Sequence, residues 1–125
     1  MTALASRIIG ARVLFVFVFL SGFWLNRSGR PINAIILTVH KLIALGTLIF
    51  IGVTVYQINQ TAQLSTAAIV ATVMTGIFFI ATIIAGGLLS LDKPVSAMSI
   101  VHKVGPFLTV AGAIVTMVLL ANPQQ

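Results

Sequence analysis

The sequence predicts an all-α membrane protein, and composition is the first reason. Of the 125 residues, 59% are hydrophobic and 6% are charged, and the mean hydropathy is +1.18. So few polar groups cannot cover a soluble domain of this size, so the expected solvent is lipid. Cysteine is absent and Asp92 is the single acid. The sequence therefore offers no thiolate chemistry and no buried carboxylate of the kind that proton-coupled transport usually needs.

Four long apolar segments are the second reason, because about 20 apolar residues cross the hydrocarbon core of a bilayer. They cover residues 8–25, 32–58, 64–89 and 95–121. The first follows Arg7 and Arg12 in the manner of a signal peptide. No small-residue cleavage motif comes after it, so we expect a retained span. Pro31 and Pro94 are expected where the second and fourth helices start, because a missing N–H costs nothing there.

Short polar connections predict antiparallel neighbours, and hence an up-down-up-down four-helix bundle in a single transmembrane domain. A repeated pattern further predicts that the bundle is built from two duplicated helical hairpins, about 1–60 and 61–125. Arg30-Pro31 precedes His40-Lys41, and Lys93-Pro94 precedes His102-Lys103. Threonines follow each histidine by seven and fourteen residues, at Thr47, Thr54, Thr109 and Thr116. This heptad spacing puts each histidine and its threonines on one helix face, which we expect to face the bundle axis.

His40 and His102 are the only histidines, and ionisable groups inside apolar segments are functional candidates. The second and fourth helices of a sequential bundle are diagonal, about 13 Å apart if neighbours are 8–10 Å apart. Two inward imidazoles would leave a slot suited to a flat macrocycle whose iron is ligated from both faces. The sequence therefore predicts one haem b per chain, with His40 and His102 as metal ligands.

Further residues are expected to complete the cofactor site. Small residues would leave room for the haem edge, and Thr82 would accept the second ring N–H of a ligand. Cations at the histidine end would pair with the two propionates. The small residues are Gly22, with Ser21 beside it, Gly86-Gly87 and Gly105, and the cations are Lys41, Lys103, Arg27, Arg30 and Lys93.

This arrangement resembles the haem-binding core of the cytochrome b561 and ferric-reductase-like families. The resemblance is carried by Val39-His40-Lys41 and Val101-His102-Lys103, with the following glycines Gly46 and Gly105. It implies a membrane b-type cytochrome for one-electron transfer, an electron-transfer component rather than a stand-alone enzyme. A quinone or a redox protein would be its partner, and it would be able to form homo-oligomers. Those families commonly have two histidine pairs and more spans, so a two-haem path across the membrane is not implied.

Several alternatives stay open from the sequence. The histidines would be structural if they bonded only to threonines or carbonyls, and a zinc or copper site is less favoured because two imidazoles are too few ligands. The chain would otherwise be a cofactor-free membrane protein, as an assembly factor, complex subunit or small-solute transporter. A haem sensor or carrier would use the same site.

The charge distribution predicts location and partners. The net charge of +6 comes from cations near the ends of apolar segments. Cations in those places are typical of contacts with lipid headgroups, so no nucleic-acid partner is expected. More of them lie at the histidine end, which the positive-inside rule assigns to the cytoplasm, with both termini outside. We expect a bacterial inner membrane.

Overall fold

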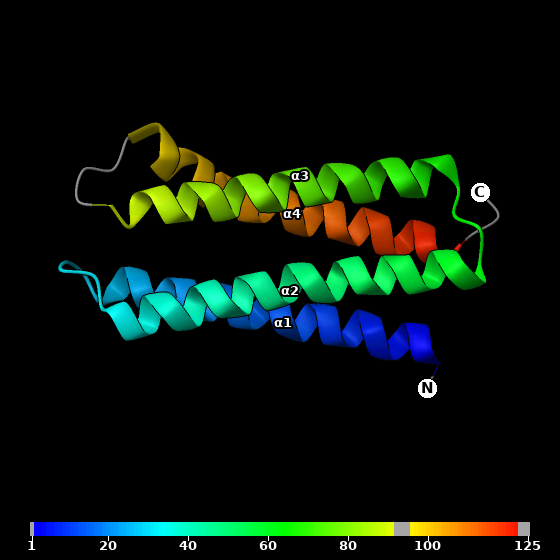
Figure 1. The fold of residues 1–125 in the computed structure, drawn as a ribbon, viewed down its shortest axis with the longest axis horizontal. Coiled ribbons are helices and arrows are strands. Elements are labelled where there is room, and N and C mark those ends of the chain that lie inside the picture. Colours follow the sequence, from blue (N-terminus) through cyan, green and yellow to red (C-terminus); the bar gives the residue numbers. More distant parts are fainter. Residues whose placement is uncertain (1, 92–95, 123–125) are drawn as a thin grey trace. The chain divides into compact units, whose positions relative to one another are not determined.

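The computed structural model describes residues 2–91 and 96–122, and the regular secondary structure within them is helical (Figure 1). The helices are α1 (Ala3–Arg27), α2 (Ala34–Thr61), α3 (Thr66–Leu89) and α4 (Ser96–Ala121). Each is long and apolar enough to cross a membrane. The shortest has 24 residues, or about 36 Å at 1.5 Å per residue, against about 30 Å of hydrocarbon. The prediction of four helices long and apolar enough to span a membrane is confirmed, and these helices indicate an integral membrane protein.

Polar caps set the helix ends more than the apolar runs do. Thr2 caps α1, because its side chain accepts a hydrogen bond from the amide of Ala5. Asn33 does the same for α2, accepting from the amides of Ile35 and Ile36 at 3.0 and 3.2 Å. The second helix therefore begins after this cap and not at Pro31, where the sequence placed its start. The corresponding expectation for Pro94 lies outside the described residues.

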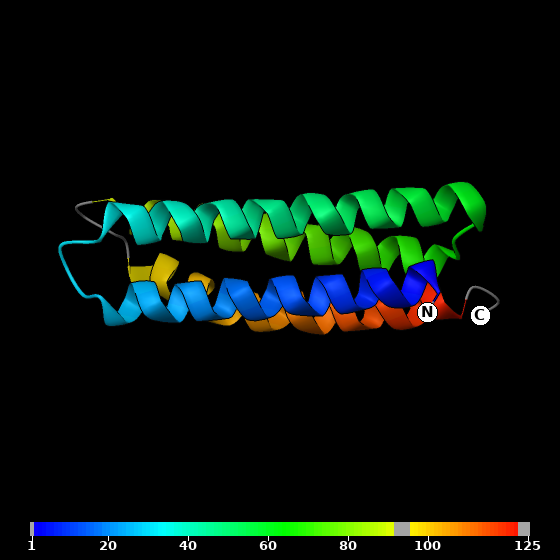
Figure 2. The same ribbon diagram turned by 90° about the horizontal axis from the view of Figure 1, so that it is seen from below.

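The chain forms two compact units, Met1–Val53 and Thr54–Gln125. The first contains α1 and most of α2, and the second contains the end of α2 with α3 and α4 (Figures 1 and 2). In the second unit α3 packs along α4. The contacts pair Thr75 with Gly112 and Thr82 with Gly105, so the two helices are antiparallel.

Small residues carry this α3–α4 contact. The threonines of α3 and the glycines of α4 are both spaced by seven residues, so the same kind of contact recurs every two turns. Glycine lets the backbones approach, as is usual where membrane helices pack without large apolar side chains between them. Each of these threonines donates its hydroxyl proton to a carbonyl one turn earlier: Thr75 to Ala71 and Thr82 to Phe78, both at 2.7 Å. Their hydroxyl groups are therefore satisfied within α3.

Replacing Gly105 with alanine is expected to destabilise this contact. The new methyl carbon would overlap the Thr82 hydroxyl and lie 3.2 Å from the Thr82 Cβ, which is branched and cannot swing away. Overpacking of this kind costs about 1–3 kcal/mol, against which alanine returns at most about 1 kcal/mol of helix propensity. Unfolding in mixed micelles would measure the net loss. Gly46→Ala in α2, where nothing lies within 4 Å, should not lose stability.

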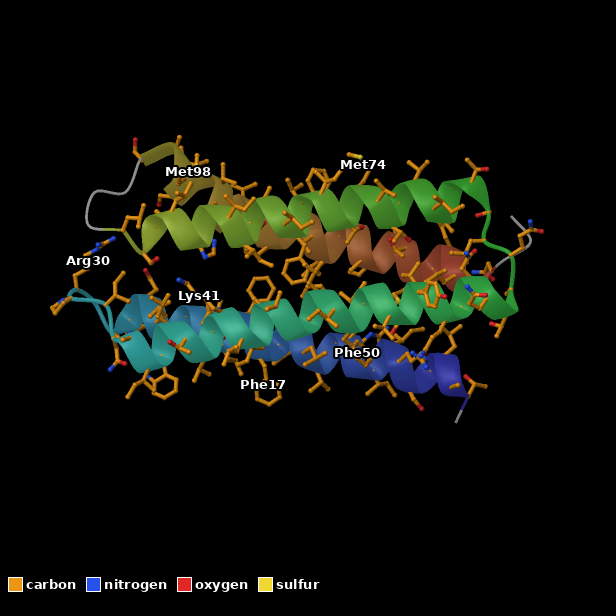
Figure 3. The ribbon with its side chains drawn as sticks, in the orientation of Figure 1. Phe17, Arg30, Lys41, Phe50, Met74 and Met98 are labelled. Atoms are coloured by element: carbon orange, nitrogen blue, oxygen red, sulfur yellow. The ribbon has the colours of Figure 1, made fainter. Side chains whose placement is uncertain are left out.

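In the first unit, α1 and α2 are also antiparallel. Gly10 lies against the ring of Phe50 (labelled in Figure 3), and Gly22 lies against the ring of His40. Large apolar side chains point outward instead, such as Phe23 on α1 and Ile35 and Leu42 on α2, which are between 63% and 76% exposed. Lipid is the solvent that suits these side chains, while small and polar residues are buried.

Candidate functional site

His102 is fixed by the backbone of α3. Its Nδ1 lies 3.0 Å from the carbonyl oxygen of Thr82. A carbonyl can only accept, so Nδ1 carries the proton and donates it. In the neutral ring, Nε2 then carries the lone pair that can bind a metal. The sequence predicted Thr82 as the acceptor for this ring N–H. The structure places Thr82 there, with its main-chain carbonyl as acceptor while its hydroxyl donates to Phe78.

His40 is fixed by a side chain of α1. Its Nδ1 lies 2.9 Å from the hydroxyl of Ser21, and that hydroxyl lies 3.0 Å from the carbonyl oxygen of Val18. Serine has a single hydroxyl proton, and the Val18 carbonyl cannot donate one. That proton can go to the Val18 carbonyl, with Nδ1 of His40 donating to the Ser21 oxygen, or to an unprotonated Nδ1 of His40, and the geometry fits both arrangements. In both histidines Nδ1 is thus the ring nitrogen that is hydrogen-bonded to the neighbouring helix.

Each imidazole packs against a glycine of the neighbouring helix. A Cβ on Gly22 would lie 3.1 Å from Cε1 of His40, and a Cβ on Gly86 would lie 2.6 Å from Cε1 of His102. Both glycines were predicted to make room for a macrocycle edge. In the structure, the space they leave is occupied by the imidazole of the neighbouring helix. Gly87 has nothing within 4 Å of its would-be Cβ, and Gly105 packs against Thr82 as described above.

The threonines that follow the histidines are buried, with Thr47 and Thr54 0% exposed and Thr109 and Thr116 1% exposed. Thr47 donates to the carbonyl of Ile43, and Thr109 to that of Gly105. The hydroxyl groups of Thr75 and Thr116 lie 3.4 Å apart across α3 and α4. The Thr75–Thr116 contact gives these two threonines a role in packing α3 against α4.

Cations occupy the histidine end of the first hairpin. Figure 3 labels Arg30 in the connection between α1 and α2, and Lys41 in the second turn of α2. Both are exposed, as are Lys103 on α4 and Arg27, whose guanidinium lies 5.9 Å from the centre of the Phe23 ring. Of these cations, Lys41 is next to His40 in the chain. Lys93, the remaining predicted partner for a propionate, lies outside the described residues.

Ser21 is the residue whose role the sequence did not reveal. It stood out only as a small neighbour of Gly22, whereas the structure makes it the partner of His40. Hairpin register is the signal that could have found it, since residues 21 and 40 are equally distant from the connection at Arg30-Pro31. In residues 2–91 and 96–122, no three or more His, Cys, Asp or Glu side chains gather as a metal site. The two imidazoles are therefore the metal-ligand candidates there.

The chain was compared with protein-family models, with curated proteins and with solved structures, and none of them matches it. The function of the chain is therefore inferred from the residues of the site and their contacts.

Proposed function

We propose that the chain is a membrane b-type cytochrome that binds one haem b, with His40 and His102 as iron ligands, and transfers single electrons. One observation carries the proposal: Nδ1 of each imidazole is hydrogen-bonded to the neighbouring helix, in His40 to the Ser21 hydroxyl and in His102 to the Thr82 carbonyl. Metal-bound histidines almost always donate their second ring N–H to such a partner, which fixes the ring and raises its basicity. In this proposal Nε2 of each ring is the atom that binds the iron.

The donor set fits haem better than a bare metal ion. Two neutral imidazoles are the axial set of a six-coordinate, low-spin haem, which supplies one-electron iron chemistry when bound. A closed zinc site needs about four protein ligands. The proposal includes an up-down bundle of two duplicated hairpins that brings both Nε2 atoms to one iron. The constant offset of 62 residues from His40, Thr47 and Thr54 to His102, Thr109 and Thr116 supports it.

The surroundings of the site suggest how the remaining haem groups would be held. Lys41, Lys103 and Arg30 would neutralise the propionates, since charge-assisted bonds to carboxylates are among the strongest in proteins. Gly105 supports the site indirectly, by letting α4 approach Thr82. The same cations favour a cytoplasmic histidine end, with both termini outside, in a bacterial plasma membrane. A haem near one face would exchange electrons with a quinone, a redox protein or a second copy of the chain.

The decisive test is the optical spectrum of the protein purified from cells grown with ample haem. We expect a red preparation with one haem b per chain, sharp low-spin bands on reduction, and no carbon monoxide binding while both axial positions are filled. The hydrogen bonds described above would also hold two structural histidines, so the haem itself must be measured. A colourless, folded preparation would indicate a cofactor-free membrane protein. Rapid loss of haem to apomyoglobin would indicate a haem sensor or carrier.

A further inference from the structure

Arg12 is an exposed cation inside the apolar part of α1. It is the only charged residue between Arg7 and Arg27. Those two arginines are 20 residues apart, which is about 30 Å of helix and matches the thickness of the hydrocarbon core. Arg7 and Arg27 therefore suit the two faces of a membrane. Arg12 is five residues further into the helix than Arg7, about 7.5 Å below it.

Within residues 2–91 and 96–122, the Arg12 guanidinium has no hydrogen bond, ion pair or aromatic contact. Arg27 differs, because its guanidinium lies 5.9 Å from the centre of the Phe23 ring. The residues one turn away from Arg12 along α1 are all apolar: Ile8, Ile9, Phe15 and Val16. An ionisable group in such surroundings is costly without a counter-charge, so Arg12 is a candidate for binding an anion from outside the chain.

Two observations indicate which anion this is. Side chains of an α-helix lean toward its N-terminus, so Arg12 leans toward the level of Arg7, and a long arginine side chain can place its charge in the headgroup layer there. None of the four helices contains an aspartate or a glutamate, so the spans of a second copy offer no carboxylate. The phosphate of a phospholipid is the anion that a membrane supplies at this level.

We propose that Arg12 binds the phosphate of a membrane phospholipid at the N-terminal end of α1. The planar guanidinium can donate two parallel hydrogen bonds to phosphate oxygens, and charge-assisted bonds of this kind are among the strongest in proteins. The neighbouring apolar side chains offer a surface for the acyl chains, since Ile9, Val13 and Val16 are between 47% and 56% exposed.

The proposed lipid site belongs to the first hairpin alone. Gly22 and Gly86, which each lie against a histidine, are 64 residues apart. At the same offset Arg12 corresponds to Gly76, which has no side chain and nothing within 4 Å of its would-be Cβ. One phosphate-dependent lipid is therefore expected per chain, and its binding does not depend on haem.

The test is a lipid titration of the purified protein in a phosphate-free detergent, followed by native mass spectrometry. The probe is dioleoylphosphatidylglycerol, and the reference is dioleoylglycerol, which has the same acyl chains and no phosphate. Arg12→Gln should weaken binding of the phospholipid about 10-fold or more, as for loss of a charge-assisted hydrogen bond, and leave the weak binding of dioleoylglycerol unchanged. Arg12→Lys should be intermediate, because lysine keeps the charge and loses the two-pronged geometry.

The matched control is Arg27→Gln, which removes the same charge from the same helix and leaves Arg30 three residues away. It should weaken phospholipid binding much less than Arg12→Gln does. Equal losses in the two variants would mean that net charge alone attracts the lipid, and would overturn the assignment to Arg12. Unchanged phospholipid binding in Arg12→Gln would overturn it as well. So would a membrane protein with an acidic residue in a span that co-purifies with the wild type and is lost in Arg12→Gln.

Discussion

Replacing either His40 or His102 with alanine is expected to abolish the six-coordinate haem spectrum. Each substitution removes one axial ligand, so the haem that remains would be five-coordinate and high-spin. Losing a direct ligand should cost more than losing an outer partner, so haem affinity should fall by about 100-fold or more. Optical spectra and haem titration of the purified variants measure both effects. Carbon monoxide should bind to the reduced variants and not to the reduced wild type.

Folding must be separated from ligation in this experiment. Each alanine also removes an interhelical hydrogen bond, worth about 1 kcal/mol, at Ser21 or at Thr82. Far-ultraviolet circular dichroism would show whether the helices persist. Methionine gives a second variant, because a thioether can ligate haem iron and raises its potential. Thr38→Ala, at an exposed position two residues before His40, is the control that should leave the spectrum intact. Wild-type spectra in both alanine variants would exclude these histidines as ligands.

The number and approximate extent of the helices could be predicted because a membrane span needs a long apolar run, and such runs are visible in sequence. The exact helix ends could not be predicted from the apolar runs, because they depend on capping residues. Asn33 stops α2 from starting at Pro31, and Thr2 starts α1 well before the apolar run at residue 8. Hydrogen bonds from main-chain amides to capping side chains follow from local geometry, which composition does not report.

The histidines could be singled out from sequence because ionisable residues are rare in spans, but their partners were predicted less well. Thr82 was chosen for its depth in the third span, and its carbonyl, which every residue has, is what accepts from His102. Gly22 and Gly86 were assigned to a macrocycle edge, although each lies under an imidazole. Side-chain patterns show which residues are unusual, whereas interhelical register decides what they touch.

Gly86 offers the sharpest test of the His102 site, because its neighbour provides a matched control. A methyl group at Gly86 would lie 2.6 Å from Cε1 and 2.9 Å from Nδ1 of His102, closer than atoms can pack. The ring must move, and its 3.0 Å hydrogen bond to the Thr82 carbonyl should be lost or lengthened. We expect Gly86→Ala to lower haem affinity about 10- to 100-fold, as for loss of an outer partner.

Gly87→Ala places the same methyl group one residue later in α3, where nothing lies within 4 Å. Both variants gain up to about 1 kcal/mol of helix propensity, so that gain cancels when they are compared. Gly22→Ala should have an intermediate haem affinity. Its Cβ would be 3.1 Å from Cε1 of His40, and a shift of a few tenths of an ångström relieves that contact. Haem titration should therefore rank the variants as Gly86→Ala weakest, then Gly22→Ala, then Gly87→Ala near wild type. Equal affinities for Gly86→Ala and Gly87→Ala would mean that the position of the His102 ring over α3 does not govern haem binding.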